Sequence, residues 1–79
     1  MIMTMKVVKK VQQDFPPASQ ASVLEYLSLY GVRAEEPEEE MVRIAILDLA
    51  AGNGDRIAEL IRLAKQDYRQ ILRQAFLQD

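Results

Sequence analysis

The stretch Glu38–Ala51 reads E-E-E-M-V-R-I-A-I-L-D-L-A-A, and it decides the fold. Past Glu40 only Arg43 and Asp48 interrupt an apolar surface that would run all the way round a helix. A helix that is apolar on every side has to be buried on most of them. The stretch therefore predicts a central helix, which must be covered by other helices of the chain or by a second copy of it.

A long helix is predicted after the turn G-N-G at 52–54, from Asp55 to about Leu77, with Asn53 or Asp55 as its cap. Its apolar residues recur at helical spacing on one wide stripe: Ile57, Leu60, Ile61, Ala64, Tyr68, Ile71, Leu72 and Ala75. A turn this short makes the two helices antiparallel neighbours. The long helix should measure about 34 Å against about 21 Å for the central one, so its last turns must pack on the two upstream helices or on another molecule. Phe76 and Leu77 lie in that overhang.

Two further helices are predicted upstream. Apolar residues within 5–15 keep helical spacing and favour a short N-terminal helix, although the β-branched residues of K-V-V-K-K-V leave a strand open. Pro16-Pro17 should end that segment. A helix from about Ala18 to Tyr30 follows, with Gly31 as its left-handed end, and Pro37 suits the first turn of the central helix.

The 79 residues are expected to form one domain, residues 1–79, an all-α antiparallel bundle of three main helices plus a short N-terminal one. A chain this short buries only about 60 % of its unfolded surface. Because it also has no cysteine for disulfides, its stability must come from helix packing or from a second copy of the chain, which makes self-association a hypothesis. No apolar run approaches the roughly 20 residues of a membrane span, and the start lacks the order of a signal peptide. We therefore expect a cytoplasmic protein with no membrane partner.

Charge is unevenly distributed along the chain, although the net charge is only -2. Residues 1–13 carry three lysines and no acid, whereas residues 14–48 carry eight acids and two arginines. The small net charge gives no overall field that would draw the chain to nucleic acid or anionic lipid. The glutamates of 36–40 are interpreted as a solvated helix start that suits the helix dipole, with a docking patch for a basic partner as the alternative.

No motif in the chain predicts catalysis. Ile46–Asp55 resembles the glycine-rich first motif of S-adenosylmethionine-dependent methyltransferases, but Ala50 replaces its first glycine and 79 residues cannot hold the βα units of such a domain. Histidine, cysteine and a G-x-S-x-G elbow are missing, which leaves at most a carboxylate-only activity. Asp55 and Glu59 lie one turn apart, too few oxygens for a hard ion. We predict no catalytic residue, cofactor or metal site.

Four basic residues form a stripe along the predicted last helix: Arg62, Lys65, Arg69 and Arg73, spaced 3, 4 and 4 residues apart. Such a stripe can follow a phosphate backbone, which makes a nucleic-acid-binding regulator the alternative function. The antiparallel hairpin instead brings Arg69 and Arg73 towards the glutamates of 36–40. We therefore expect ion pairs there, within the chain or between subunits.

Two charges interrupt the apolar central helix, and each needs a partner or a path to water. Arg43 is expected to extend along the helix so that its guanidinium reaches an edge. Asp48 is expected to be paired, at a subunit seam or beside Tyr68, with partner recognition as the alternative.

The segment from Tyr30 to Leu72 resembles a group of short bacterial proteins of unassigned function. The resemblance lies in the order of four pieces: Y-G-V, E-E-E-M-V-R-I-A-I-L-D-L-A, G-D and L-A-K-Q-D-Y-R-Q-I-L. The pattern of those proteins is an R-V-x-L-A-I-L-K-L-A helix, a G-D turn and a final A-x-x-D-Y-R-D-V-L helix. This chain has Asp48 where that pattern has lysine and Gln70 where it has aspartate. The resemblance implies a compact all-helical bacterial protein, and it supplies no activity.

These features together predict a noncatalytic interaction protein that forms a homodimer or binds another protein. The residues proposed for contact are the overhanging Phe76 and Leu77, together with Asp48 and the basic stripe.

Overall fold

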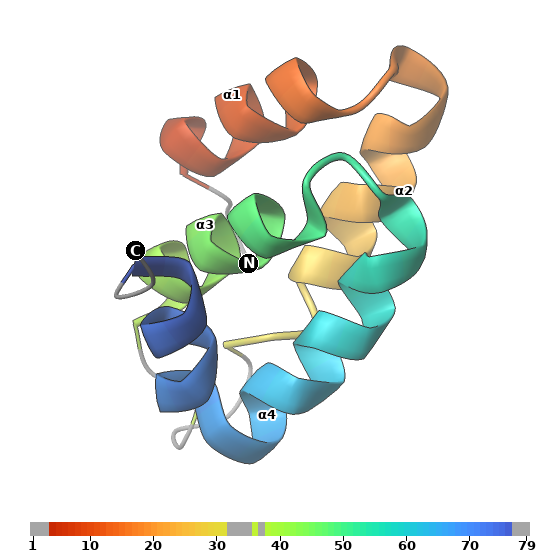
Figure 1. Ribbon diagram of the computed structural model, residues 1–79. Coiled ribbons are helices and arrows are strands. Elements are labelled where there is room, and N and C mark those ends of the chain that lie inside the picture. Colours follow the sequence, from red (N-terminus) through yellow and green to blue (C-terminus); the bar gives the residue numbers. More distant parts are fainter. Residues whose placement is uncertain (1–3, 32–35, 37, 77–79) are drawn as a thin grey trace.

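The computed structural model describes residues 4–31, 36 and 38–76, and within them it has four helices and no strand. The helices are α1 (Met5–Asp14), α2 (Pro17–Leu27), α3 (Glu39–Ala50) and α4 (Gly54–Phe76). Figure 1 shows α3 in the middle, with α1 on one side and the last turns of α4 on another. α2 packs against α1 and α4. The predicted all-α bundle around a central helix is confirmed.

The N-terminal segment is helical, which removes the strand alternative. The Thr4 hydroxyl accepts a hydrogen bond from the Val7 amide at 3.5 Å and caps α1. Phe15 is extended, as expected for a residue before proline, and Pro17 begins α2. α2 ends at Leu27, earlier than predicted, and a turn follows as far as Gly31, whose φ is +93°.

The central helix begins and ends close to the predicted positions. Glu39 and Glu40 occupy its first turn, as expected from the dipole, while Pro37 lies outside the described residues. At the other end Ala51 takes the left-handed conformation with φ +50°, and Gly52 follows with φ +82°. The Asn53 side chain then accepts the Asp55 amide at 3.0 Å, so Asn53 caps α4.

α4 is bent, so the prediction of a straight helix with an overhanging end is wrong. Asp67 has φ −157° and ψ 87°, and its carboxylate accepts the Arg69 amide at 3.2 Å, which caps the turns beyond it. The bend directs those turns back onto α3, and Ile71 is fully buried. Phe76 therefore lies beside α3 and does not project past it, and Leu77 is outside the described residues.

The apolar core draws on all four helices and on the two connections at Phe15 and Tyr30. Its buried members are Val7, Val11, Phe15, Val23, Leu27, Tyr30, Val42, Ala45, Ile46, Leu47, Ala50, Ile57, Leu60, Ile61, Ala64 and Ile71. α3 supplies a large share of this core, as its apolar surface predicted. Across the described ranges, none of the helices has the length and apolar character that crossing a membrane requires.

Candidate interaction site

Arg43 lies in the interior, so the expectation that it reaches an edge is wrong. The side chain is 1 % exposed. Its Nε donates to the Leu27 carbonyl at 3.1 Å, its Nη2 donates to the Tyr30 carbonyl at 2.7 Å, and its Nη1 lies 3.7 Å from a Glu39 oxygen. Burial lowers the pKa of the guanidinium, and the charge of Glu39 acts in the opposite direction. Arg43 thus fastens the end of α2 to α3 and is a structural residue.

Glu36 forms a second polar link close by. It is 4 % exposed, and it accepts hydrogen bonds from the Gly31 amide at 2.8 Å and from the Lys65 ammonium at 2.9 Å. The predicted pairing between the last helix and the glutamates therefore exists. Lys65 forms this ion pair with Glu36, whereas the prediction had assigned such pairs to Arg69 and Arg73.

Tyr30 lies beside these links, and it should make the free energy of unfolding depend on pH in the alkaline range. Burial, and next the charge of Glu36, raise the pKa of the Tyr30 phenol from 10.0 to about 12. A folded state that holds its proton more tightly is stabilised fully below the unfolded pKa, and it loses that stabilisation as pH rises through the folded pKa. The raised pKa of Lys10, caused mainly by its hydrogen bond with Asp48, acts in the same direction above 10.5. We expect urea midpoints that fall between pH 10 and about 12.

Two conservative variants check this assignment. Tyr30→Phe should flatten the fall, whereas Tyr26→Phe, at a tyrosine that is 44 % exposed, should keep the wild-type pH profile. Identical profiles for both variants would assign the alkaline loss to other groups.

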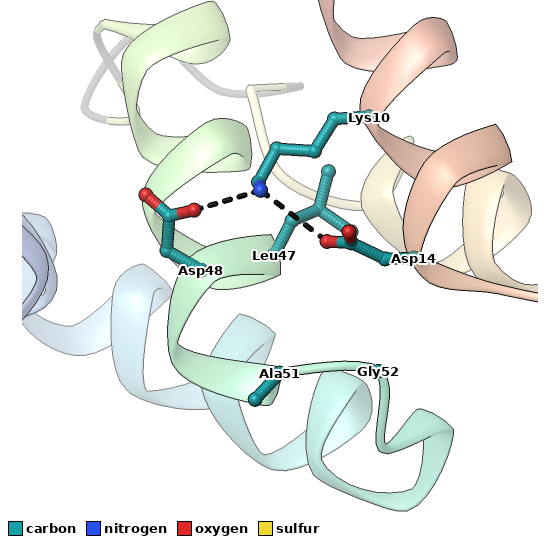
Figure 2. A pocket seen from close by; sticks show the side chains of 6 residues that line it. All are labelled: Lys10, Asp14, Leu47, Asp48, Ala51 and Gly52. Carbon is teal, nitrogen blue, oxygen red and sulfur yellow. Dashed lines mark ion pairs between the residues drawn. The ribbon is translucent and has the colours of Figure 1, made fainter.

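Asp48 is paired within the chain, as expected, although its partner is not Tyr68. The Lys10 ammonium lies 2.8 Å from an Asp48 oxygen and 3.3 Å from an Asp14 oxygen, joining α1 to α3. Figure 2 shows this ammonium between the two carboxylates at the edge of a cavity of about 250 Å³, with Leu47 below. Lys10 pairs with both carboxylates, and the two acids leave the cavity with one net negative charge.

The basic stripe of the sequence is divided by the bend at Asp67. Arg62 and Lys65 precede the bend, and Arg69 and Arg73 follow it, so the four residues no longer share one straight helix face. Lys65 is engaged by a glutamate, and Arg69 lies over the ring of the preceding tyrosine, 5.7 Å from its centroid.

Three adjoining cavities form a continuous surface across α1, α3 and the end of α4. The first, of about 310 Å³, lies between α1 and α3 and includes Lys6, Lys9 and Ile44. The second, of about 350 Å³, is lined by Lys6, Glu40, Met41, Ile44 and Phe76. The third, of about 310 Å³, is lined by Arg69, Leu72, Arg73 and Phe76. We call this surface the Met41 face: Lys6, Lys9, Glu40, Met41, Ile44, Arg69, Leu72, Arg73 and Phe76.

The centre of the Met41 face is apolar and open to solvent. Met41 is 48 % exposed and Phe76 is 46 % exposed, and both line the same cavity. Ile44 and Leu72 beside them are half-buried. Large apolar side chains that are exposed together mark interaction sites more often than scattered ones do.

The edges of the Met41 face carry more positive than negative charge. Lys6 and Lys9 stand on the α1 side, and Arg69 and Arg73 on the α4 side. Within the described part of the chain these four cations form no ion pair with a carboxylate, and neither does Glu40, the acid that lies among them.

The structure brings three of the predicted contact residues together on this face: Arg69, Arg73 and Phe76. Arg62 and Lys65 line none of its three cavities, whereas Asp48 lines the first of them and is held there by Lys10. Leu77 lies outside the described residues.

Sequence reasoning missed the other half of the face. Lys6, Lys9, Met41 and Ile44 come from helices whose relative placement no local pattern gives. The sequence held one indication of this half of the face, the three lysines without an acid in residues 1–13. Cations without a nearby acid either face solvent or bind a partner.

Comparisons with protein-family models, with curated proteins and with solved structures give no match to the chain. The resemblance to short bacterial proteins therefore stays a prediction. In the described ranges no three acidic side chains converge as they would around a metal ion. Function has to be argued from the Met41 face itself.

Proposed function

We propose that the chain is a noncatalytic protein-interaction module that self-associates through the Met41 face. The observation that carries this proposal is the pair Met41 and Phe76, each nearly half exposed on the wall of one cavity of about 350 Å³. Covering them with a partner removes apolar surface from water, at roughly 25 cal/mol for each Å². Methionine is flexible and fits differently shaped partners, which suits a contact surface.

The charges on the face determine how such a dimer should respond to salt. A two-fold contact places the same patch of both subunits together, so the cations of one subunit (Lys6, Lys9, Arg69 and Arg73) face a patch with the same excess of positive charge. That arrangement is repulsive, and dissolved ions screen it. We therefore expect a weak dimer that becomes tighter as salt increases.

Light scattering coupled to size exclusion, at several protein concentrations, tests this proposal. Wild type should rise from the 9.0 kDa of one chain towards twice that mass, whereas Phe76→Gln should stay near 9.0 kDa. Glutamine removes the apolar contact without adding a charge. Leu29→Gln is the matched control, because Leu29 is 49 % exposed and lines none of the three cavities.

A wild-type chain that stays monomeric at high micromolar concentration, in both low and high salt, would count against self-association. Equal loss of dimer in Phe76→Gln and Leu29→Gln would place the contact elsewhere. Circular dichroism of each variant checks that the helices are kept.

Nucleic-acid binding through the basic stripe receives less support. The bend at Asp67 divides the stripe, and Glu36 neutralises Lys65. A phosphate backbone needs a row of free cations, which the divided stripe no longer offers.

A further inference from the structure

Self-association leaves the charge of the Met41 face without a counterpart. Lys6, Lys9, Arg69 and Arg73 surround the apolar centre. Two acids also line these cavities, Glu40 and Asp48, and Asp48 is paired with Lys10. A second copy brings the same excess of positive charge, whereas interfaces that form readily carry complementary charge. The face therefore fits a partner with carboxylates better than it fits itself.

We propose that the Met41 face binds an acidic amphipathic helix of another protein. The apolar stripe of that helix covers Met41, Ile44 and Phe76, and its carboxylates face lysines on the α1 side and arginines on the α4 side. The proposal rests on the proposed function, since it uses the same face, and it names the partner's chemistry. The partner helix and a second copy of this chain compete for one surface.

The shape of the face supports a helical occupant. Figure 1 shows that α1 and the last turns of α4 stand on different sides of α3, and the three cavities follow one another across this surface through shared residues. An apolar floor between two charged edges is the arrangement by which a groove receives an amphipathic helix. The apolar residues contact the floor at helical spacing, while charges on both flanks set the orientation.

The net charge of the chain cannot by itself attract an acidic partner. With a net charge of -2, the chain as a whole repels an acidic peptide, so attraction has to come from the local cations of the face. Salt should therefore weaken the complex with an acidic helix, whereas it should tighten the homodimer. The acidic-helix complex and the homodimer therefore respond to salt concentration in opposite directions.

Two synthetic peptides of about five helical turns, or about 18 residues, provide the probe. Both carry the same leucine stripe, and one has glutamates on its flanks where the other has lysines. Fluorescence anisotropy of the labelled peptides should show the acidic peptide binding at least about tenfold more tightly than the basic one. Adding the acidic peptide should also convert the homodimer to a complex of one chain with one peptide in light scattering.

Single charge reversals locate the site. Arg73→Glu and Lys6→Glu should each weaken the acidic peptide several-fold and strengthen the basic one. Arg62→Glu is the control, since it makes the same change at an exposed α4 residue that lines none of the three cavities. Phe76→Gln should weaken both peptides, because both use the apolar floor.

The outcomes separate this inference from the proposed function. A dimer that Phe76→Gln splits, combined with equal affinity for the two peptides, would overturn the acidic partner and keep the interaction module. A chain that neither dimerises nor binds either peptide would overturn both. Displacement of the acidic peptide by a mixed-sequence single-stranded DNA, in wild type and Phe76→Gln alike, would assign the cations to nucleic acid and overturn the inference.

Discussion

Replacing Arg43 by alanine should lower the free energy of unfolding by about 3 kcal/mol or more, a large part of the stability of a domain this small. The guanidinium is 1 % exposed and donates to the carbonyls of Leu27 and Tyr30. Alanine removes these two charged donors and leaves a cavity where a large buried side chain had been. The loss comes from the buried hydrogen bonds and packing, because the paired Glu39 is 46 % exposed and can return to water.

Urea unfolding followed by circular dichroism measures this effect. Arg62→Ala is the control, an exposed arginine whose loss should change stability by less than about 0.5 kcal/mol. Arg43→Lys should fall between the two, since an ammonium on a flexible stem does not reproduce a planar fork that reaches two carbonyls. If the alanine variant does not fold, the lysine variant still reports the effect. A midpoint for Arg43→Ala close to that of Arg62→Ala would show that the links are dispensable.

Gly31→Ala should cost about 1–3 kcal/mol, since Gly31 combines a left-handed backbone with a crowded position. Its φ is +93°, and a Cβ placed there would lie 2.6 Å from Cγ of Glu39 and 3.3 Å from Nη2 of Arg43. Glu39 is able to swing away, but it then leaves the guanidinium that it accompanies. The expected loss thus contains a backbone part and an electrostatic part.

Gly54→Ala is the matched glycine control. It opens α4, its φ is not positive, and the nearest atom to an added Cβ is Cε1 of Phe15 at the ordinary distance of 3.9 Å. We expect this variant to be neutral or more stable by up to about 1 kcal/mol. Combining Gly31→Ala with Glu39→Ala removes the clash, so the pair should cost less than the sum of the single changes. Equal urea midpoints for the two glycine variants would contradict the crowding at Gly31.

The fold was predictable where a local pattern has a single packing solution. The all-round apolar stretch of α3 needs covering on most sides, and the G-N-G turn leaves α4 no place but beside it. The bend at Asp67 was not predictable, because K-Q-D-Y-R holds no proline or glycine, the usual causes of a kink. The last turn of α4 lies beside α3, where Phe76 lines one cavity with Met41 and Ile44, residues far from it in the chain.

The candidate site was predictable only in part for the same reason. Phe76 and Arg73 stand out as an apolar residue and a cation near the end of an amphipathic helix. The contribution of Lys6 and Met41 depends on how α1 lies across α3, which no spacing along the chain encodes. Arg43 was placed at an edge because the carbonyls that accept its hydrogen bonds lie more than ten residues earlier, in a turn whose position the sequence does not give.

The polar links around Gly31 have a consequence for how the domain opens. The end of α2 is held by a guanidinium from α3, and the Gly31 amide is held by a carboxylate that a lysine of α4 contacts in turn. Fraying of α2 from this end would therefore break the hydrogen bond between Leu27 and Arg43 of α3, which raises the free-energy cost of local opening. We therefore expect the backbone hydrogens at this end of α2 to exchange more slowly than those of a helix end without such links.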